Sequence, residues 1–99
     1  MTAVTAAGST QADAAALSEG FNVVTGADAT KGVVLPTAVA GMRVELKSVT
    51  AAVLKIYPAT GGAINAIAAN GALSLASLCP VVLVATSATQ WYSIPLLPS

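Results

Sequence analysis

Residues 43–58 read RVELKSVTAAVLKIYP, and this stretch decides the fold class. Within residues 43–48, charged side chains alternate with apolar or small ones, which is the period-2 pattern of a strand with one face in water. Residues 54–57 repeat the alternation, with Leu54 and Ile56 on one side. The two runs are separated by Thr50-Ala51, and we predict that they pair as an antiparallel hairpin.

The composition predicts self-association. The 99 residues make one domain. Charged residues are 8% of the chain and apolar residues 56%, whereas a typical soluble protein has about 25% charged residues. No residue after Lys55 carries a charge. Because so few charges cannot cover an isolated small domain, we expect a homo-oligomer in which other copies cover part of the surface.

The same composition argues against several classes of partner and site. The mean hydropathy is +0.80, but the best apolar window, residues 72–85, is shorter than the roughly 20 residues of a membrane-spanning helix and contains Pro80. A net charge of zero without a basic run predicts no nucleic-acid partner. The single cysteine, Cys79, excludes an intrachain disulfide and a cysteine-based metal cluster, and we expect it to be buried.

The chain is expected to divide into an N-terminal arm, residues 1–20, and one β domain, residues 21–99. The arm is rich in Ala, Thr and Ser, and Leu17 is a lone large apolar residue in its second half. An edge strand at residues 2–5 and a helical turn or strand at residues 13–17 are both compatible with it. We expect the arm to become ordered against a neighbour or to stay mobile, with Leu17 as a candidate interface residue.

Short strand patterns with turn signals between them follow along the domain. About seven or eight such strands indicate an all-β fold, a small antiparallel β-sandwich or barrel. Residues 81–86 lack polar alternation, so both faces of this strand should be covered, and it is the candidate central strand. The expected core is Leu46, Leu54, Ile56, Leu75, Leu83 and Val84.

The C-terminal end holds the other candidate interface residues. Trp91 and Tyr92 should point to opposite faces of a strand at residues 90–94, and aromatic side chains there can anchor an interface, although a single Trp in a small all-β domain is more often part of the core. The apolar tail, residues 95–99, holds Leu96 and Leu97 between two prolines. Leaving both leucines in water would forgo roughly 1.5–3 kcal/mol each. We therefore expect the tail to contact a neighbouring subunit or another protein.

The inventory of reactive side chains argues against an enzyme. The chain contains no histidine, and its four carboxylates are scattered, so neither a catalytic triad nor a carboxylate dyad is indicated. Asp28 beside Thr30 and Lys31 reads as a solvated turn rather than an ion site. Arg43, Glu45, Lys47 and Lys55 read as a solvated face of the hairpin rather than a recognition face. No cofactor or metal is expected.

Several segments in a fixed order carry a resemblance to a known class of protein. They are Gly32–Pro36 (GVVLP), Ala40–Val44, Leu54–Gly61 (LKIYPATG), Ile64-Asn65 with Ala68–Asn70, and Ala88–Tyr92 (ATQWY). In this order the chain resembles small virion-associated proteins of tailed bacteriophages. The resemblance covers about residues 30–94 and leaves the arm unmatched.

The resemblance implies a non-enzymatic structural protein of the virion. The expected role is a head decoration or cement protein that binds the major capsid protein or another virion protein. It would bridge capsid subunits as an oligomer, a trimer being favoured, and would be located on the capsid surface after synthesis in the host cytoplasm. The alternative is a tail, fibre or receptor-binding β module that contacts a host glycan or protein. A receptor-binding module predicts exposed aromatic side chains in a loop cluster.

Overall fold

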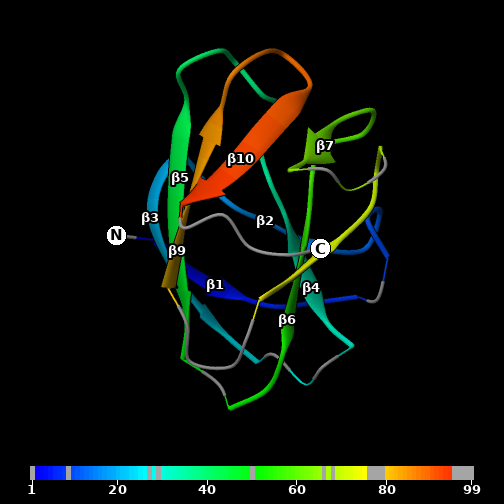
Figure 1. Ribbon diagram of the computed structural model, residues 1–99. Coiled ribbons are helices and arrows are strands. Elements are labelled where there is room, and N and C mark those ends of the chain that lie inside the picture. Colours follow the sequence, from blue (N-terminus) through cyan, green and yellow to red (C-terminus); the bar gives the residue numbers. More distant parts are fainter. Residues whose placement is uncertain are drawn as a thin grey trace.

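The protein is an all-β structure of two sheets (Figure 1). The computed structural model describes residues 2–8, 10–26, 28, 30–49, 51–65, 67, 69–75 and 80–94. Within these ranges there are ten short strands and no helix. The predicted all-β class is therefore confirmed.

The strands divide six to four between the sheets. The larger sheet has the order β1-β3-β5-β9-β10-β7, with β1 (Thr2–Thr5), β3 (Gly20–Thr25), β5 (Arg43–Ser48), β9 (Pro80–Ala85), β10 (Gln90–Ile94) and β7 (Ala63–Ile64). The smaller sheet has the order β2-β4-β6-β8, with β2 (Ala15–Ala16), β4 (Gly32–Val34), β6 (Leu54–Tyr57) and β8 (Leu73–Leu75).

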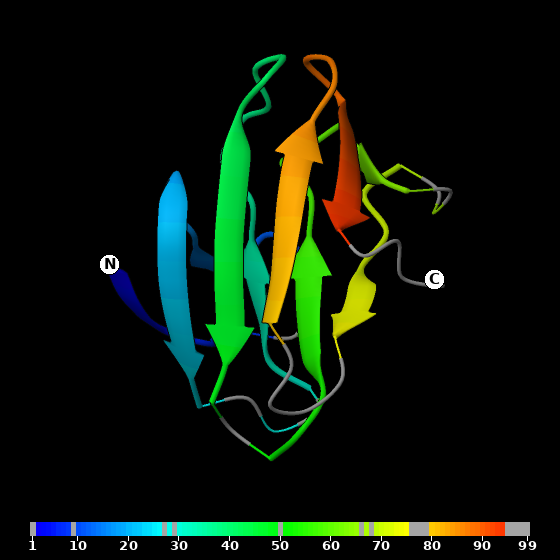
Figure 2. The ribbon, with the colours of Figure 1, turned by 60° about the vertical axis from the view of Figure 1, so that its left-hand side comes forward.

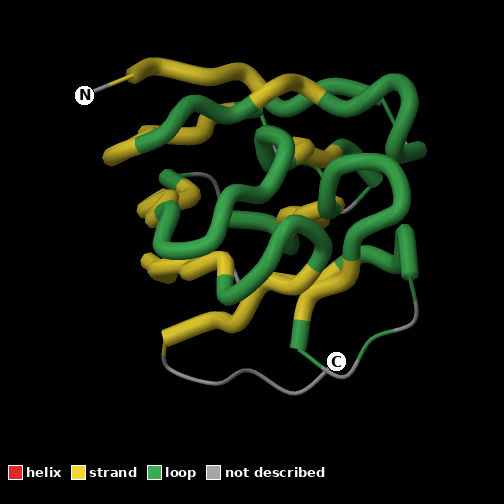
Figure 3. Tube along the Cα trace, turned by 90° about the horizontal axis from the view of Figure 1, so that it is seen from above, coloured by secondary structure: helices red, strands yellow, loops and turns green. Residues whose placement is uncertain are grey.

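The first six strands alternate between the two sheets. β1, β3 and β5 lie parallel in the larger sheet, and β2, β4 and β6 lie parallel in the smaller one. Each connection between parallel neighbours passes through a strand of the opposite sheet, and the view from above shows the loops that cross between the layers (Figure 3). The result is a solenoid-like stack, in which each turn packs on the next.

The predicted antiparallel hairpin at residues 43–58 is wrong. β5 pairs with β3 and β9, whereas β6 pairs with β4 and β8 in the other sheet. Side-chain alternation is the same in either arrangement, and the connection at residues 49–53 lacks the Asn-Gly or Asp-Gly pair of a tight hairpin turn. Of the eight strand pairings in the described chain, five are parallel, so the antiparallel prediction fails for most of the fold.

The last four strands return along the stack. β8 runs antiparallel to β6, and β9 runs antiparallel to both β5 and β10. β9 thus lies in the interior of the larger sheet, as the sequence predicted for a central strand. β7 is a two-residue strand parallel to β10.

One hydrophobic core lies between the sheets. Alternation turns Val44, Leu46, Leu83 and Trp91 inward from the larger sheet, and each is fully buried. The smaller sheet contributes Leu54, Ile56, Leu73 and Leu75. Every residue of the predicted core is buried except Val84, which lies on the opposite face of β9 and is half-buried.

The segment predicted as an arm contributes strands to both sheets. β1 pairs with β3, and β2 pairs with β4. Val4 and Leu17 belong to the core, with exposed fractions of 9% and 4%. The described part of residues 1–20 therefore packs within the domain rather than extending from it. The sequence prediction treated a segment of mostly small side chains as unable to join the core. In the structure the neighbouring strands already provide apolar side chains, and small residues can pack against them.

Asn22 fixes the turn that leads into β3. It is fully buried, and its amide nitrogen donates to the carbonyl oxygens of Ser18 (2.9 Å), Gly20 (3.2 Å) and, on β5, Glu45 (3.1 Å). Its side-chain oxygen accepts from the Ser18 backbone N–H (3.1 Å). A buried polar group is stable only when hydrogen-bonded in this way.

Candidate interaction surface

The outward surface of the larger sheet is formed by more strands than that of the smaller one. β3, β5, β9 and β10 lie side by side across it (Figure 2). We call this surface the outer face. Among the side chains that the structure describes there, and apart from the charged residues of β5, six apolar ones occupy outward or strand-end positions, namely Phe21, Val23, Pro80, Val82, Val84 and Tyr92.

The strand register brings these apolar residues into rows. Val84 on β9 lies beside Tyr92 on β10. Val82 lies one row away, beside Glu45 on β5, and Glu45 in turn lies beside Phe21 on β3. Phe21 is 40% exposed and Tyr92 45% exposed. Phe21 and Tyr92 lie on strands that are separated by β5 and β9, so apolar side chains remain exposed on both sides of the charged strand and are candidates for binding another molecule.

β5 places the charged residues in the middle of the outer face. Arg43, Glu45 and Lys47 all point outward, and the Arg43 guanidinium lies 3.6 Å from a Glu45 carboxylate oxygen. Both side chains of this pair are well exposed, so the ion pair adds little to stability. Lys55 belongs to β6 in the other sheet. The four charges that the sequence placed on one hairpin face are therefore divided between two sheets.

The outward surface of the smaller sheet is smaller and better covered. Tyr57 on β6 points outward there but is only 9% exposed. Its ring packs so closely over Gly32 on β4 that a Cβ at that glycine would come within 2.8 Å of the ring. In the loop that precedes β2, the Gln11 side-chain nitrogen donates a hydrogen bond to the Pro58 carbonyl oxygen (2.7 Å). This bond holds the loop against the smaller sheet. The two outer surfaces therefore differ, and the outer face of the larger sheet is the better candidate for binding.

The structure separates the candidate interface residues. Trp91 is fully buried in the core and Leu17 is 4% exposed, so neither is available at the surface of this chain. Tyr92 is on the outer face, opposite in direction to Trp91 as predicted. Leu96 and Leu97 lie outside the described residues, as does Cys79.

Sequence reasoning missed Phe21 and the outward valines of β9. The signal for the valines was present, because the apolar run at residues 81–86 predicted a strand covered on both faces. In the single chain the inner face of β9 is covered, whereas Val82 and Val84 on the other face are only half-buried. The pattern thus predicts a partner for the outer face.

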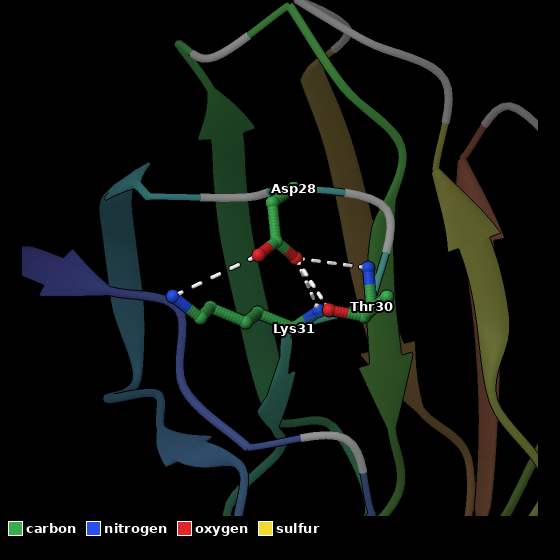
Figure 4. Close-up of polar contacts among 3 residues, drawn as sticks. All are labelled: Asp28, Thr30 and Lys31. Carbon is green, nitrogen blue, oxygen red and sulfur yellow. Dashed lines mark hydrogen bonds and ion pairs between the residues drawn. The ribbon is translucent and has the colours of Figure 1, made fainter.

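The turn at Asp28 is satisfied by its own hydrogen bonds (Figure 4). One Asp28 carboxylate oxygen accepts from the Thr30 hydroxyl (2.6 Å), the Thr30 backbone N–H (3.0 Å) and the Lys31 backbone N–H (3.1 Å), and the other lies 3.8 Å from Lys31 Nζ. The Thr30 hydroxyl, followed by the Thr30 N–H, lowers the pKa of Asp28 below its ordinary value. The geometry is that of a capped turn, which agrees with the solvated turn predicted here.

Clusters of metal-ligating side chains and membrane-spanning helices are both absent from the described residues. No group of three or more potential metal ligands occurs among them. They also contain no helix with the length and hydropathy required to cross a membrane.

Comparisons with known proteins identify no relative of this chain. No protein-family model matches it, and neither the curated proteins nor the solved structures include a significant match.

Proposed function

We propose that this protein is a non-enzymatic structural protein of a virion that decorates or cements the capsid by bridging capsid subunits. The observation that carries the proposal is the outer face, where Phe21, Val82, Val84 and Tyr92 are exposed or half-buried on a regular sheet. The resemblance of residues 30–94 to small virion-associated proteins of tailed phages supports the setting. The absence of histidine from the chain supports a role without catalysis.

The outer face would act by burying apolar surface against the capsid protein. Each fully buried Phe or Val side chain contributes roughly 1.5–3 kcal/mol. The charges on β5 would select the orientation and the partner rather than supply most of the affinity. Attachment of several linked copies multiplies weak affinities, because later contacts form within one assembly.

The proposed particle component is a homo-oligomer with three subunits as the expected number, located on the capsid surface. We interpret its two sheets as the layers of a small sandwich that is wound like a solenoid. Leu96 and Leu97 remain proposed contacts to a neighbour or to the capsid. Deleting residues 95–99 should then weaken attachment while leaving the thermal midpoint of the isolated subunit unchanged.

The positions of the exposed aromatic residues favour this proposal over a receptor-binding module. Phe21 and Tyr92 lie on strands of the outer face, whereas a receptor-binding module would present its aromatic side chains in a loop cluster. A surface formed by neighbouring strands is suited to contact with the surface of another protein.

Substitutions on the two outer surfaces test the proposal. Tyr92→Glu and Phe21→Glu should each reduce the number of copies bound to capsids of the cognate major capsid protein by about tenfold or more, measured by co-sedimentation. Ser74→Glu is the matched control, because Ser74 is exposed on the smaller sheet. Electron microscopy of particles with and without the protein locates the bound copies. Folded Tyr92→Glu and Phe21→Glu variants that bind as well as the Ser74→Glu variant would exclude the outer face as the capsid contact.

A further inference from the structure

The two edges of the larger sheet differ in how their backbone groups are protected. At the β7 edge, the Asn65 side chain continues the ladder where the two-residue strand ends. Its oxygen accepts from the Ser93 backbone N–H (3.0 Å), and its nitrogen donates to the Ser93 hydroxyl (3.0 Å). Gln90 Nε2 also donates to the Asn65 carbonyl oxygen (2.9 Å). A very short edge strand is one of the usual protections of a sheet edge, and here the Asn65 side chain adds to it by occupying the Ser93 N–H.

Within the described residues, the β1 edge shows no such protection along Thr2–Thr5, and beyond the strand Ala7 exchanges two backbone hydrogen bonds with Gly32 of β4. β1 pairs with β3 on one side and with no other strand of the described chain. Its four residues, Thr2–Thr5, include no charged residue and no proline, which are the residues that commonly prevent edges from pairing. Ala3 and Thr5 are exposed.

Strand geometry shows which backbone groups of β1 are directed outward. The backbone N–H of Ala6 donates to the Thr25 carbonyl oxygen on the β3 side (2.8 Å). Backbone groups alternate in direction along a strand, so those of Val4 also face β3. Those of Ala3 and Thr5 therefore face away from the sheet and are available to an added strand.

We propose that this edge pairs with β1 of a second copy of the chain, antiparallel and around a two-fold axis. In the register that uses all the outward groups, Ala3 lies opposite Thr5 of the second copy, and the two copies of Val4 lie opposite each other. Ala3 and Thr5 then form hydrogen-bonded pairs, while Val4 forms a pair without such bonds.

The β1 sequence favours a second copy as the occupant. A two-fold pairing requires that inward residues meet inward residues, and the central Val4, 9% exposed, meets its own counterpart. β-Branched side chains opposite each other stabilise antiparallel pairs. The edge is also neutral, so two copies approach without repulsion of like charges. The contact is isologous, and it joins subunits in pairs.

This inference concerns contacts between copies and does not depend on capsid attachment. Pairing at β1 predicts six subunits in solution where it joins two of the trimers proposed above, and two subunits where the threefold contact forms only on the capsid. An even subunit number therefore distinguishes it from a simple trimer.

A proline in β1 tests the inference. Ala3→Pro removes an outward N–H but none of the bonds to β3, and proline is tolerated on edge strands. Light scattering at micromolar concentration should show an even subunit number for the unaltered protein and half that mass for Ala3→Pro. Ala3→Ser keeps the N–H and should keep the full mass, and circular dichroism checks that each variant is folded. A monomer or a trimer for the unaltered protein, or a folded Ala3→Pro of full mass, would overturn the inference.

A cysteine at the two-fold axis tests the register separately, and it decides the question should Ala3→Pro fail to fold. Directly opposed residues in a pair without hydrogen bonds have Cα atoms about 4.5 Å apart, which is within the range of a disulfide. Val4→Cys should therefore give a covalent dimer on mild oxidation, seen on a non-reducing gel. Thr5→Cys and the unaltered protein, which retains Cys79, should not. Equal crosslinking of Val4→Cys and Thr5→Cys would contradict the proposed register.

Discussion

The first six strands and the last four differ in strand direction and in how they are distributed, because β1–β6 alternate strictly between the two sheets whereas β9 and β10 follow each other in the larger one. β1–β6 form two parallel sets, whereas β8 and β9 enter the sheets antiparallel to β6 and β5. All the charged residues lie in the first part, at or before Lys55. Side-chain alternation is the same in the two parts, so it cannot account for the difference in strand direction. The direction follows instead from where each connection carries the chain.

Each part contains an asparagine whose side chain bonds to the backbone, fully buried in the first part and half-buried in the last. In the first part Asn22 fixes one turn of the stack to the next strand, β5. In the last part Asn65, with a φ of 52°, takes the place of a strand residue beside β10. In both residues the side-chain amide makes hydrogen bonds of the kind that a backbone peptide group makes in a regular strand. The predictions below test whether the two parts depend on each other for stability.

Removal of Trp91 should have the largest effect. Its side chain is fully buried in the shared core, although it lies in the last part of the chain. Trp91→Ala should lower the free energy of unfolding by about 3–5 kcal/mol, measured by denaturant titration. Trp91→Phe should cost much less, because it fills most of the volume and removes a buried indole N–H for which the described residues offer no hydrogen-bond partner. A small loss for Trp91→Ala would mean that the first part is stable alone.

Loss of the Asn22 side chain should rank second. Asn22→Ala leaves the carbonyl oxygens of Ser18 and Glu45 without this donor, at a cost of about 1–3 kcal/mol. Hydrogen exchange should show faster opening first in β3 and its neighbours. Val23→Ala, on the outward side of the same strand, is the control and should cost less. Equal effects of the two substitutions would show that the hydrogen bonds of Asn22 contribute nothing beyond its volume.

Asn65→Ala should have a smaller effect than Asn22→Ala. Asn65 is half-buried at a sheet edge, so water can replace the lost bonds to Ser93. We expect a loss of about 0.5–1.5 kcal/mol in thermal or denaturant unfolding. Asn65→Gly also removes the side-chain hydrogen bonds, but glycine adopts the positive φ without strain. Comparing it with Asn65→Ala therefore separates the cost of the backbone conformation from the cost of the lost hydrogen bonds. A larger loss of unfolding free energy for Asn65→Ala than for Asn22→Ala would contradict the expected ranking of the two substitutions.

The smallest expected effect is the pH dependence of the Asp28 turn. Hydrogen bonds from Thr30 lower the pKa of Asp28 in the folded state below its ordinary value of 3.8. The carboxylate therefore stabilises the fold above pH 3.8, and this contribution is lost as the pH falls through the lowered value. Thermal melts of the unaltered protein and Asp28→Asn should differ slightly at neutral pH and converge in acid. A difference that grows on acidification would contradict this sign.

The sequence by itself determined the all-β class and most of the core. Alternation at residues 43–48 and 54–57 turned Leu46, Leu54 and Ile56 inward, as the structure confirms. The apolar run at residues 81–86 identified the central strand. These features depend on the side chains within one strand, and a period of two is readable from a single segment.

Only the tertiary structure decided which strands are neighbours, in which direction they run and which apolar residues remain exposed. A connection such as residues 49–53 has no local signal that distinguishes a hairpin from a crossing to the opposite sheet. The parallel pairs went unrecognised because the connecting element is a strand rather than a helix. Trp91 and Tyr92 are adjacent in sequence, yet one is in the core and the other on the outer face. A side chain is buried when the other sheet packs against its face of the strand. Contacts between residues far apart in the sequence decide where that other sheet lies.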